Sequence, residues 1–466
     1  MRGLLDSPWF YFSLAAVLAI GAVASQFRYS SPPKPAGTFD QIATLAERGD
    51  LNVVFIVADT LRADHLGIYG YERPTSPHID RLAERGIRFA NVEAQSSWTK
   101  SSMASIWTAM YPQRNGIHRY ADGIPEQALM PAEIFRDAGY ATAGIYRNSW
   151  VGPNFGFGQG FQRYVKSAPS FNRERLQVSN PSAQGLTGSD LDVTESASEF
   201  IGANSDNRFL LYVHYMDVHQ YSYDSDSDLF GSDFGDLYDN SIHWLDINVE
   251  RVVKTLEILG ILDKTIVVLT SDHGEGFREH GFEGHAKGLY KEVQFTPWLI
   301  SLPFDLPEPI VVEAQVASID IWPTLLDLVG LPPLHDADGL SAVPAIMAAA
   351  GGEPVPEAFR DRAIFAQIDR RWGKVNKPDD PSISIVRGPH RMYRWLRLPA
   401  SDELFDHRDD PVELENVLQD QPEVAEDLRA QIDAFLEDTE PAWQTLDIEL
   451  DAMRLNQLRA LGYKID

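Results

Sequence analysis

Two segments of the sequence end in side chains that could bind a divalent metal ion. Asp59 follows the apolar run at residues 51–58, and Asp272 and His273 closely follow a similar run at residues 265–270. A buried carboxylate is costly unless it is paired or bound to a cation. Carboxylate oxygens together with an imidazole nitrogen suit a hard or borderline divalent ion such as Mn, Zn, Ca or Mg. Each residue alone is also typical of a helix cap or a loop, so the metal interpretation depends on the repeated pattern.

The elements that must position these residues alternate between strands and helices. Runs rich in β-branched and aromatic residues predict buried strands at residues 51–58, 141–146, 209–213 and 265–270, and a helical pattern extends over residues 238–259. Near-continuous apolar runs are typical of parallel strands that are covered on both faces. We therefore predict an α/β sandwich, with a large, mostly parallel sheet between helices and with site residues at the carboxyl ends of strands.

Changes of composition divide the chain into four parts. Residues 1–27 are mostly apolar, residues 28–50 begin with a Pro-rich linker, residues 51–350 carry the strand and helix alternation, and residues 351–466 contain short strand-like pieces and a helical pattern. We expect a catalytic α/β domain followed by a small C-terminal sheet-plus-helix (α+β) subdomain.

The N-terminal segment predicts export. Residues 8–27 carry no charge and are long enough to cross the hydrocarbon core once as a helix. The small residues Ala22, Val23 and Ala24 also resemble a signal-peptide cleavage site. A retained single-pass anchor in the cell membrane and a cleaved signal peptide, with a periplasmic or secreted product, are the two alternatives. Both place the remaining chain outside the cytoplasm.

The overall composition excludes some functions. The chain has no cysteine, which rules out disulfides, thiolate metal sites and cysteine nucleophiles. Its formal net charge is −28, which argues against a nucleic-acid partner because a surface that follows phosphates needs clustered Lys and Arg.

Residues 97–112, with the sequence SWTKSSMASIWTAMYP, resemble the signature of the sulfatase family within the alkaline phosphatase superfamily. In that family a Cys or Ser opens the signature and is oxidised to formylglycine. Here Thr99 stands at that position, and Ser101 and Met103 replace the Pro and Arg of the signature. Oxidation of Thr would give a ketone rather than an aldehyde. The resemblance therefore favours an unmodified Thr99 as nucleophile, as in the phosphoryl-transfer branches of the superfamily. Segments at 75–83 and 405–416 also resemble family landmarks.

The resemblance implies roles for single residues. Asp59, Thr99, Asp272 and His273 would hold the metal, although sulfatases usually carry a second Asp where Thr60 stands and more often Asn at the last position. His219 would be catalytic, meeting the substrate anion.

Further residues are implied as a second set. Asp217, His219 and His285 are expected either to hold a second metal ion or to bind the substrate anion. Lys100, Lys287 and His118 are expected to contact the substrate.

The function expected from these residues is hydrolysis of a phosphate mono- or diester by an exported, metal-dependent enzyme. A small molecule, a lipid head group or an envelope polymer would carry the ester, and transfer of the phosphoryl group to an envelope component is a variant. One alternative is a sulfuric ester hydrolase that works without formylglycine. The other is a catalytically inactive binding module.

Overall fold

The computed structural model describes residues 34–167, 176–178, 188–374, 377–450 and 455–456. Residues from Pro35 onward form one compact unit, and the preceding unit, Met1–Lys34, lies almost entirely outside the described residues. The predicted anchor or signal peptide at residues 1–27 therefore falls outside them. Within the described part of the chain, no helix is long and apolar enough to cross a membrane.

The predicted linker is partly folded. Its described part contains helix α3 (Asp40–Ala43) and a 3₁₀ turn at Leu45–Glu47, which bury Ile42 and Leu45 in the main hydrophobic core. These two apolar side chains are three positions apart, so one turn of helix directs both to the same side.

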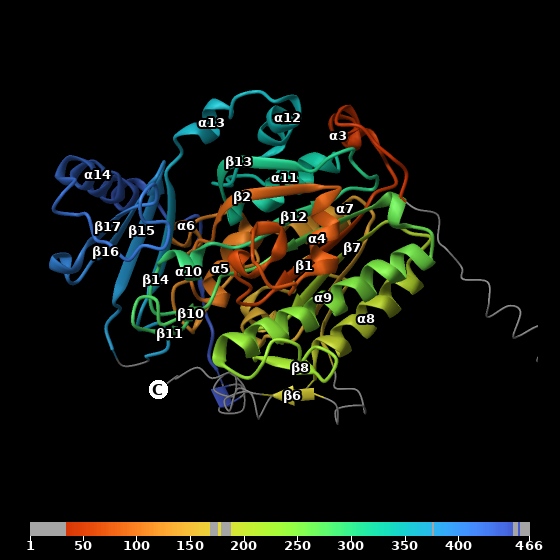
Figure 1. The fold of residues 1–466 in the computed structure, drawn as a ribbon, viewed down its shortest axis with the longest axis horizontal. Coiled ribbons are helices and arrows are strands. Elements are labelled where there is room, and N and C mark those ends of the chain that lie inside the picture. The colour runs from red at the N-terminus through yellow and green to blue at the C-terminus, as the bar shows by residue number, and fades with distance from the viewer. Residues whose placement is uncertain (1–33, 168–175, 179–187, 375–376, 451–454, 457–466) are drawn as a thin grey trace, which may run out of the picture. The chain divides into compact units, whose positions relative to one another are not determined.

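The central sheet has eight strands in the order β13-β2-β12-β9-β1-β7-β4-β5 (Figure 1). All neighbouring strands pair in parallel except β12, which is antiparallel to β9 and β2. The four predicted strands are confirmed as β1, β4, β7 and β9. The bounds are β1 Asn52–Ala58, β2 Ile87–Glu93, β4 Ala141–Tyr146, β5 Arg163–Lys166, β7 Phe209–Tyr215, β9 Thr265–Thr270, β12 Trp298–Ser301 and β13 Ile310–Ala317.

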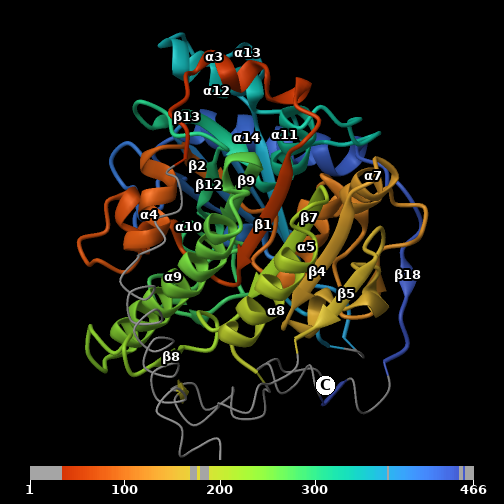
Figure 2. The ribbon, with the colours of Figure 1, turned by 90° about the vertical axis from the view of Figure 1, so that its right-hand side faces the viewer.

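Helices cover both faces of this sheet. Successive side chains of a strand point to opposite faces, so each apolar strand contributes side chains to both cores. Val54 and Ile56 of β1 join the core under α4, α8 and α9, whereas Val53 and Phe55 join the core under α5, α7 and α11. Figure 2 shows α8 and α9 running side by side across the near face. The bounds are α4 Pro77–Glu84, α5 Thr99–Thr108, α7 Pro131–Asp137, α8 Asp190–Ala203, α9 Phe234–Ile258, α11 Ile321–Leu328 and α12 Val343–Gly351. The predicted α/β sandwich with a mixed, mostly parallel sheet is confirmed.

Helix α9 begins one turn earlier than the sequence pattern predicts. Asp233 and Asp236 form a capping box at its N-terminus, which satisfies backbone N–H groups that have no partner within the helix. The buried face is spaced by three or four residues, at Ile242, Leu245, Val249, Val252 and Leu256.

A second, antiparallel sheet follows in the C-terminal part. Its strands are β14 (Ile364–Asp369), β15 (Pro381–Arg387), β16 (His390–Trp395) and β17 (Glu403–Asp406), paired in that order. Helix α14 (Pro422–Asp438) packs on it through a shared core that includes Ile383, Ile385, Leu428 and Ile432. The expected sheet-plus-helix architecture is present here.

Glu413 connects this second sheet to the segment that follows β9. Its carboxylate is fully buried and accepts hydrogen bonds from Arg391 Nε, from His407 Nε2 and from the backbone N–H of Lys291, while its carbonyl oxygen lies 2.6 Å from His280 Nε2. The position of residues 280–291 thus depends on the C-terminal part. The remaining short elements are α6 Pro112–Asn115, α10 Lys291–Gln294, α13 Glu357–Arg360, β3 Asp122–Gly123, β6 Leu176–Val178, β8 Ser222–Asp224, β10 Gly276–Phe277, β11 Glu283–Gly284 and β18 Leu446–Asp447.

Candidate active site

Parallel pairing of β1 with β9 brings the two predicted metal-binding strand ends together. The register pairs Val57 with Thr270, so Asp59 and Asp272 lie two residues further along adjacent strands. The backbone N–H of Thr60 donates to Asp272 Oδ1 at 3.2 Å. The prediction that these strand ends lie side by side is confirmed.

Each of the two carboxylates has one oxygen held by the protein and one that accepts no hydrogen bond from the described residues. Asp59 Oδ2 accepts from Asn148 Nδ2 at 2.6 Å and lies 3.1 Å from His214 Nε2, whereas its Oδ1 is buried without a donor. Asp272 Oδ1 accepts two backbone N–H groups, whereas its Oδ2 is buried without a donor. Two buried carboxylate oxygens are thus left for a cation.

The imidazole of His273 presents a lone pair to the same place. Its Nδ1 lies 2.9 Å from the carbonyl oxygen of Gly274, which can only accept, so Nδ1 carries the proton and Nε2 of the neutral ring is an acceptor. Nε2 is 3.3 Å from Asp272 Oδ2 and 3.3 Å from Thr99 Oγ1.

Asp59, Asp272 and His273 therefore fit a divalent metal ion. One ligand atom from each lies within 4.8 Å of the others, and this is the one such group of three that the described residues form. Burial and the neighbouring charge of Asp59 raise the pKa of Asp272. Burial opposes ionisation of Asp59 as well, but the hydrogen bond from His214 and the nearby imidazoles lower its pKa. A bound cation would compensate both carboxylates, and Thr99 Oγ1, the fourth member of the predicted set, lies 3.3 Å from His273 Nε2.

Two residues that support this site were not found from the sequence. Asn148, two residues after β4, donates to Asp59 and lies with its Nδ2 3.5 Å from Thr99 Oγ1. His214 lies inside β7, in register with Val57 of β1. A polar residue within an otherwise apolar strand was the available signal for His214.

The predicted histidines gather beside His273. The ring centroid of His285 is 4.6 Å from that of His273 and 5.0 Å from that of His219. His285 Nδ1 lies 3.1 Å from Glu275 Oε1. Burial lowers the pKa of His219 to about 4 and that of His285 well below its ordinary value, and it raises the pKa of Glu275 to about 7. His219 and His285 therefore border the group of Asp59, Thr99, Asp272 and His273.

Lys100 turns away from this group, although it follows Thr99 directly. Its Nζ donates to the carbonyl oxygens of Tyr120 (2.7 Å) and Asp122 (2.6 Å). It also lies over the rings of Trp98, Trp150 and Phe155. Successive residues of a helix point about 100° apart, so Lys100 points in a different direction from Thr99. The same loop contains His118, whose backbone N–H donates to Asp122 Oδ2 at 2.8 Å.

Asp217 lies in a separate buried network, and this placement does not fit the expected second metal site. Its Oδ1 forms an ion pair with Arg147, and its Oδ2 accepts from the backbone N–H of Asp190 (2.7 Å) and from Trp244 Nε1 (2.9 Å). Both oxygens are thus already used. Lys287 is exposed, and its Nζ donates to the carbonyl oxygen of Glu283.

Unusual backbone geometry accompanies the strand ends. Thr60 has a φ of +62°, a left-handed conformation that is rare for a β-branched residue. A Cβ at Gly274 would lie 2.1 Å from the carbonyl oxygen of Glu292, so only glycine fits there. The turns after β1 and β9 are therefore held in costly or glycine-specific shapes next to the candidate metal ligands.

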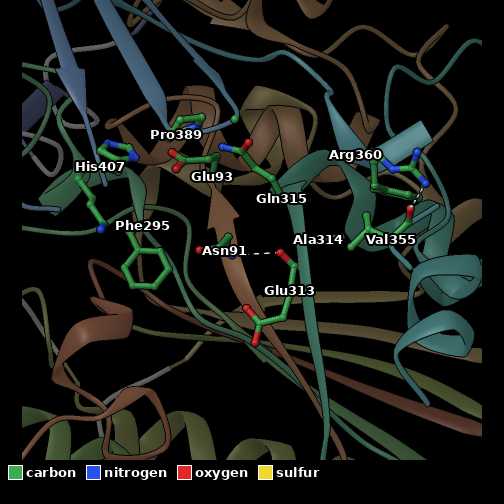
Figure 3. A pocket seen from close by; sticks show the side chains of 13 residues that line it. Asn91, Glu93, Phe295, Glu313, Ala314, Gln315, Val355, Arg360, Pro389 and His407 are labelled. Atoms are coloured by element: carbon green, nitrogen blue, oxygen red, sulfur yellow. Dashed lines mark hydrogen bonds between the residues drawn. The ribbon is translucent and has the colours of Figure 1, made fainter. Parts of the chain in front are cut away.

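A cavity of about 450 Å³ lies elsewhere, between β2, β13 and the C-terminal part (Figure 3). Asn91, Glu93, Phe295, Glu313 and His407 are among its lining residues, and Asn91 Nδ2 donates to the Glu313 carbonyl oxygen at 3.2 Å. None of the candidate metal ligands lines this cavity.

The chain belongs to the sulfatase family. A family model described as Sulfatase matches residues 51–331, and one described as N-sulphoglucosamine sulphohydrolase, C-terminal, matches residues 278–440. The chain is therefore a sulfatase-family hydrolase of the alkaline phosphatase superfamily. Proteins of this family typically bind a divalent metal ion, for which Asp59, Asp272 and His273 are a possible site.

Several known proteins align with most of the chain. An N-acetylgalactosamine-6-O-sulfatase of Bacteroides thetaiotaomicron is 24% identical and aligns over 81% of this chain and 91% of its own length. An ulvan-active sulfatase of Formosa agariphila is 24% identical and aligns over 91% of this chain and 84% of its own length. Among solved structures, a 2-O GAG sulfatase superposes with a TM-score of 0.69 at 18% identity, over 87% and 96% of the two chains. The phosphonate monoester hydrolase of Agrobacterium radiobacter superposes with a TM-score of 0.65 at 20% identity, over 83% of this chain and 95% of its own.

These relatives contradict the expected phosphate mono- or diester substrate. Three relatives that match at the level of sequence over 81% to 91% of the chain are named as sulfatases. The sulfuric ester alternative fits this finding better. The physical reason is that a Thr hydroxyl beside a metal site does not distinguish a sulfate from a phosphate ester, because both groups are tetrahedral anions.

Proposed function

We propose that this protein hydrolyses sulfate monoesters of carbohydrates with an unmodified Thr99 and a divalent metal ion held by Asp59, Asp272 and His273. The observation that carries the proposal is the Thr99 hydroxyl, which lies 3.3 Å from His273 Nε2 beside two buried carboxylate oxygens without donors. The names of the relatives support a sulfate ester on a carbohydrate.

The residues of the site have complementary roles in this proposal. Thr99 Oγ1 attacks the sulfur, the ester oxygen leaves as an alcohol, and the proton of the Thr99 hydroxyl ends on that alcohol. Water then cleaves the sulfated Thr99, which restores its hydroxyl and releases sulfate. His219 and His285 contact the sulfate oxygens, and His219 transfers the proton. When bound, the metal ion supplies positive charge that favours ionisation of the Thr99 hydroxyl and offsets the charge of the sulfate.

The test is sulfate release by the purified, metal-loaded protein. The substrates are N-acetylgalactosamine 6-sulfate, sulfated ulvan oligosaccharides and an aryl sulfate, with a phenyl phosphonate monoester for comparison. We expect free sulfate from at least one sulfate ester and none with Thr99→Ala. No release from any sulfate ester, or equal release by Thr99→Ala, would contradict the proposal.

We also propose that the catalytic domain lies outside the cytoplasm, because residues 8–27 have the length and composition of an export signal or anchor. An alkaline phosphatase reporter fused after Asp466 should be active in an export-competent bacterial host. Deletion of residues 1–27 should abolish this activity, and an equally active deletion variant would refute export by this segment.

A further inference from the structure

The loop between β14 and β15 is positively charged, although the protein as a whole is strongly acidic. Residues 370–377 contain Arg370, Arg371, Lys374 and Lys377 and no acidic residue, whereas the chain has a formal net charge of −28. A polymer with many sulfate groups is repelled by such a net charge unless a local positive surface lies on its path.

This loop borders the candidate active site. The ring of Trp372 stacks on that of Trp98, with centroids 4.4 Å apart and an interplanar angle of 18°, and Trp98 immediately precedes Thr99. The backbone N–H of Tyr120 donates to the carbonyl oxygen of Trp372 at 3.1 Å. Tyr120 in turn accepts from Lys100, the residue after Thr99. Trp98 therefore contacts the loop directly, and Lys100 contacts Tyr120, which is hydrogen-bonded to the loop.

Contacts to the backbone hold the described residues of this loop, 370–374 and 377. Arg119 Nη2 donates to the carbonyl oxygens of Lys374 (2.6 Å) and Arg371 (3.4 Å). These bonds use main-chain atoms, so the side chains of the loop are not needed for them. The side chain of Arg371 is 39% exposed, and Lys377 is exposed.

The acidic residues next to the loop have arginine partners, and Arg370 and Arg371 share Asp380. Asp380 pairs with Arg370 at 2.8 Å and Asp379 pairs with Arg397 at 2.6 Å. The Nε of Arg371 remains 3.5 Å from Asp380, and Lys377 forms no ion pair within the part of the chain that the structure describes. The arginines of β16 differ, because Arg391 contacts Glu93 and Glu413 and Arg394 contacts Asp402 and Asp433.

We propose that Arg371 and Lys377 bind a further anionic group of a polyanionic carbohydrate whose sulfate ester reaches Thr99. This inference rests on the proposed function, which it makes more specific: the substrate is an oligosaccharide or polysaccharide with several anionic groups, each a sulfate or a carboxylate. The loop binds one of these groups outside the reacting centre, in addition to the contacts that the ester makes beside Thr99.

The test is binding of polyanions to the full chain, measured by calorimetry at several NaCl concentrations. The probes are dextran sulfate for sulfate groups, polygalacturonate for carboxylates and neutral dextran as a control. We expect binding of at least one polyanion, which weakens with salt, and no binding of neutral dextran. Arg371→Ala/Lys377→Ala should weaken polyanion binding by at least about tenfold, because two cationic contacts are lost.

The matched control is Arg81→Ala/Lys254→Ala, which removes the same charge from two exposed side chains. Lys254 lies near the end of α9, shortly before β9 begins, whereas Asp272 follows the other end of β9. The dissociation constant of this variant for the polyanion should lie within about twofold of the wild-type value. Equal weakening by both double variants, no polyanion binding by the wild type, or equally tight binding of single-stranded oligothymidylate would overturn the inference.

Binding and turnover separate this inference from the proposed function. Thr99→Ala should still bind the polyanion that the wild type binds, because the loop does not depend on the Thr99 hydroxyl. A protein that binds polyanions through the loop but releases no sulfate refutes the proposed function alone. If the wild type releases sulfate and the Arg371→Ala/Lys377→Ala variant binds polyanions as tightly as the wild type, only the inference about the loop is refuted.

Discussion

The Thr99 hydroxyl lies 3.3 Å from Nε2 of His273, although the two residues are 174 positions apart in the chain. Thr99 begins helix α5, and His273 belongs to the turn after β9. The contact places a hydroxyl beside the imidazole lone pair and the two carboxylate oxygens that accept no hydrogen bond. The group that would attack the substrate and the groups that would hold the metal therefore share one buried location.

Metal removal should destabilise the protein, because an ion that binds only the folded state adds to the free energy of unfolding. Chelation should lower the unfolding temperature of the wild type, and added Mn²⁺ or Zn²⁺ should restore it. Asp272→Asn should lose the metal, as measured by elemental analysis. In chelator it should be more stable than the wild type by about 1–3 kcal/mol, because one of two adjacent buried carboxylates is gone.

Asp246→Asn is the control for this experiment. Asp246 is also a fully buried carboxylate, but it accepts the backbone N–H groups of His78 and Ile79. Its replacement should lower stability and leave the metal content unchanged. A wild-type protein that shows no bound metal and no response to chelation would contradict the metal site.

Replacements of Thr99 should distinguish the contribution of its hydroxyl to turnover from that of its methyl group. Thr99→Ala should lower kcat at least about 10³-fold, whereas Thr99→Ser should stay within about tenfold, because Ser keeps the hydroxyl. Thr108→Ala, which removes another buried hydroxyl from the same helix, is the control. Mass spectrometry of the Thr99 peptide should show an unoxidised side chain, and an oxidised one would refute the unmodified hydroxyl.

Asp217→Asn should destabilise the fold without changing the metal content. The variant leaves the buried Arg147 without its full counter-charge, and breaking a buried ion pair costs about 3–5 kcal/mol. Denaturant unfolding and elemental analysis measure the two effects. A loss of one bound metal ion per chain in this variant would revive the second metal site at Asp217, His219 and His285.

The contribution of His280 to stability should depend on pH. Burial lowers its pKa, but Glu292 and the Glu413 carbonyl oxygen outweigh this effect and raise the pKa to about 9. A raised pKa in the folded state means that the stabilisation is complete below the ordinary pKa of 6.5 and is lost as the pH rises through about 9.

The measurement for His280 is the free energy of unfolding of the wild type and of His280→Gln between pH 6 and 10. The difference between them should be largest near pH 6 and should shrink as the pH approaches 9. His335→Gln is the control for loss of an exposed histidine. A difference that does not change with pH would contradict the assignment.

Much of the central sheet follows from short-range sequence. Residues 51–58 and 265–270 are near-continuous apolar runs, which are typical of strands covered on both faces, and each run leads into a carboxylate. Asp59, Asp272 and His273 could therefore be assigned to strand ends before the register of β1 and β9 was known. Thr99 was recognised from the signature around it. The nature of the ester could not be recognised in this way, because the same hydroxyl suits a sulfate and a phosphate.

Tertiary structure decided which polar side chains meet. Asp217 was expected at a second metal or anion site and Lys100 at the substrate, yet Asp217 pairs with Arg147 and Lys100 binds the loop at Tyr120. Asn148 and His214 support Asp59 from β4 and β7, because those strands lie next in the sheet. Local sequence determines that a strand forms and where it ends, since apolar burial and backbone preference act over a few residues. The neighbours of a side chain depend on strand order, register and helix rotation, which many distant contacts determine together.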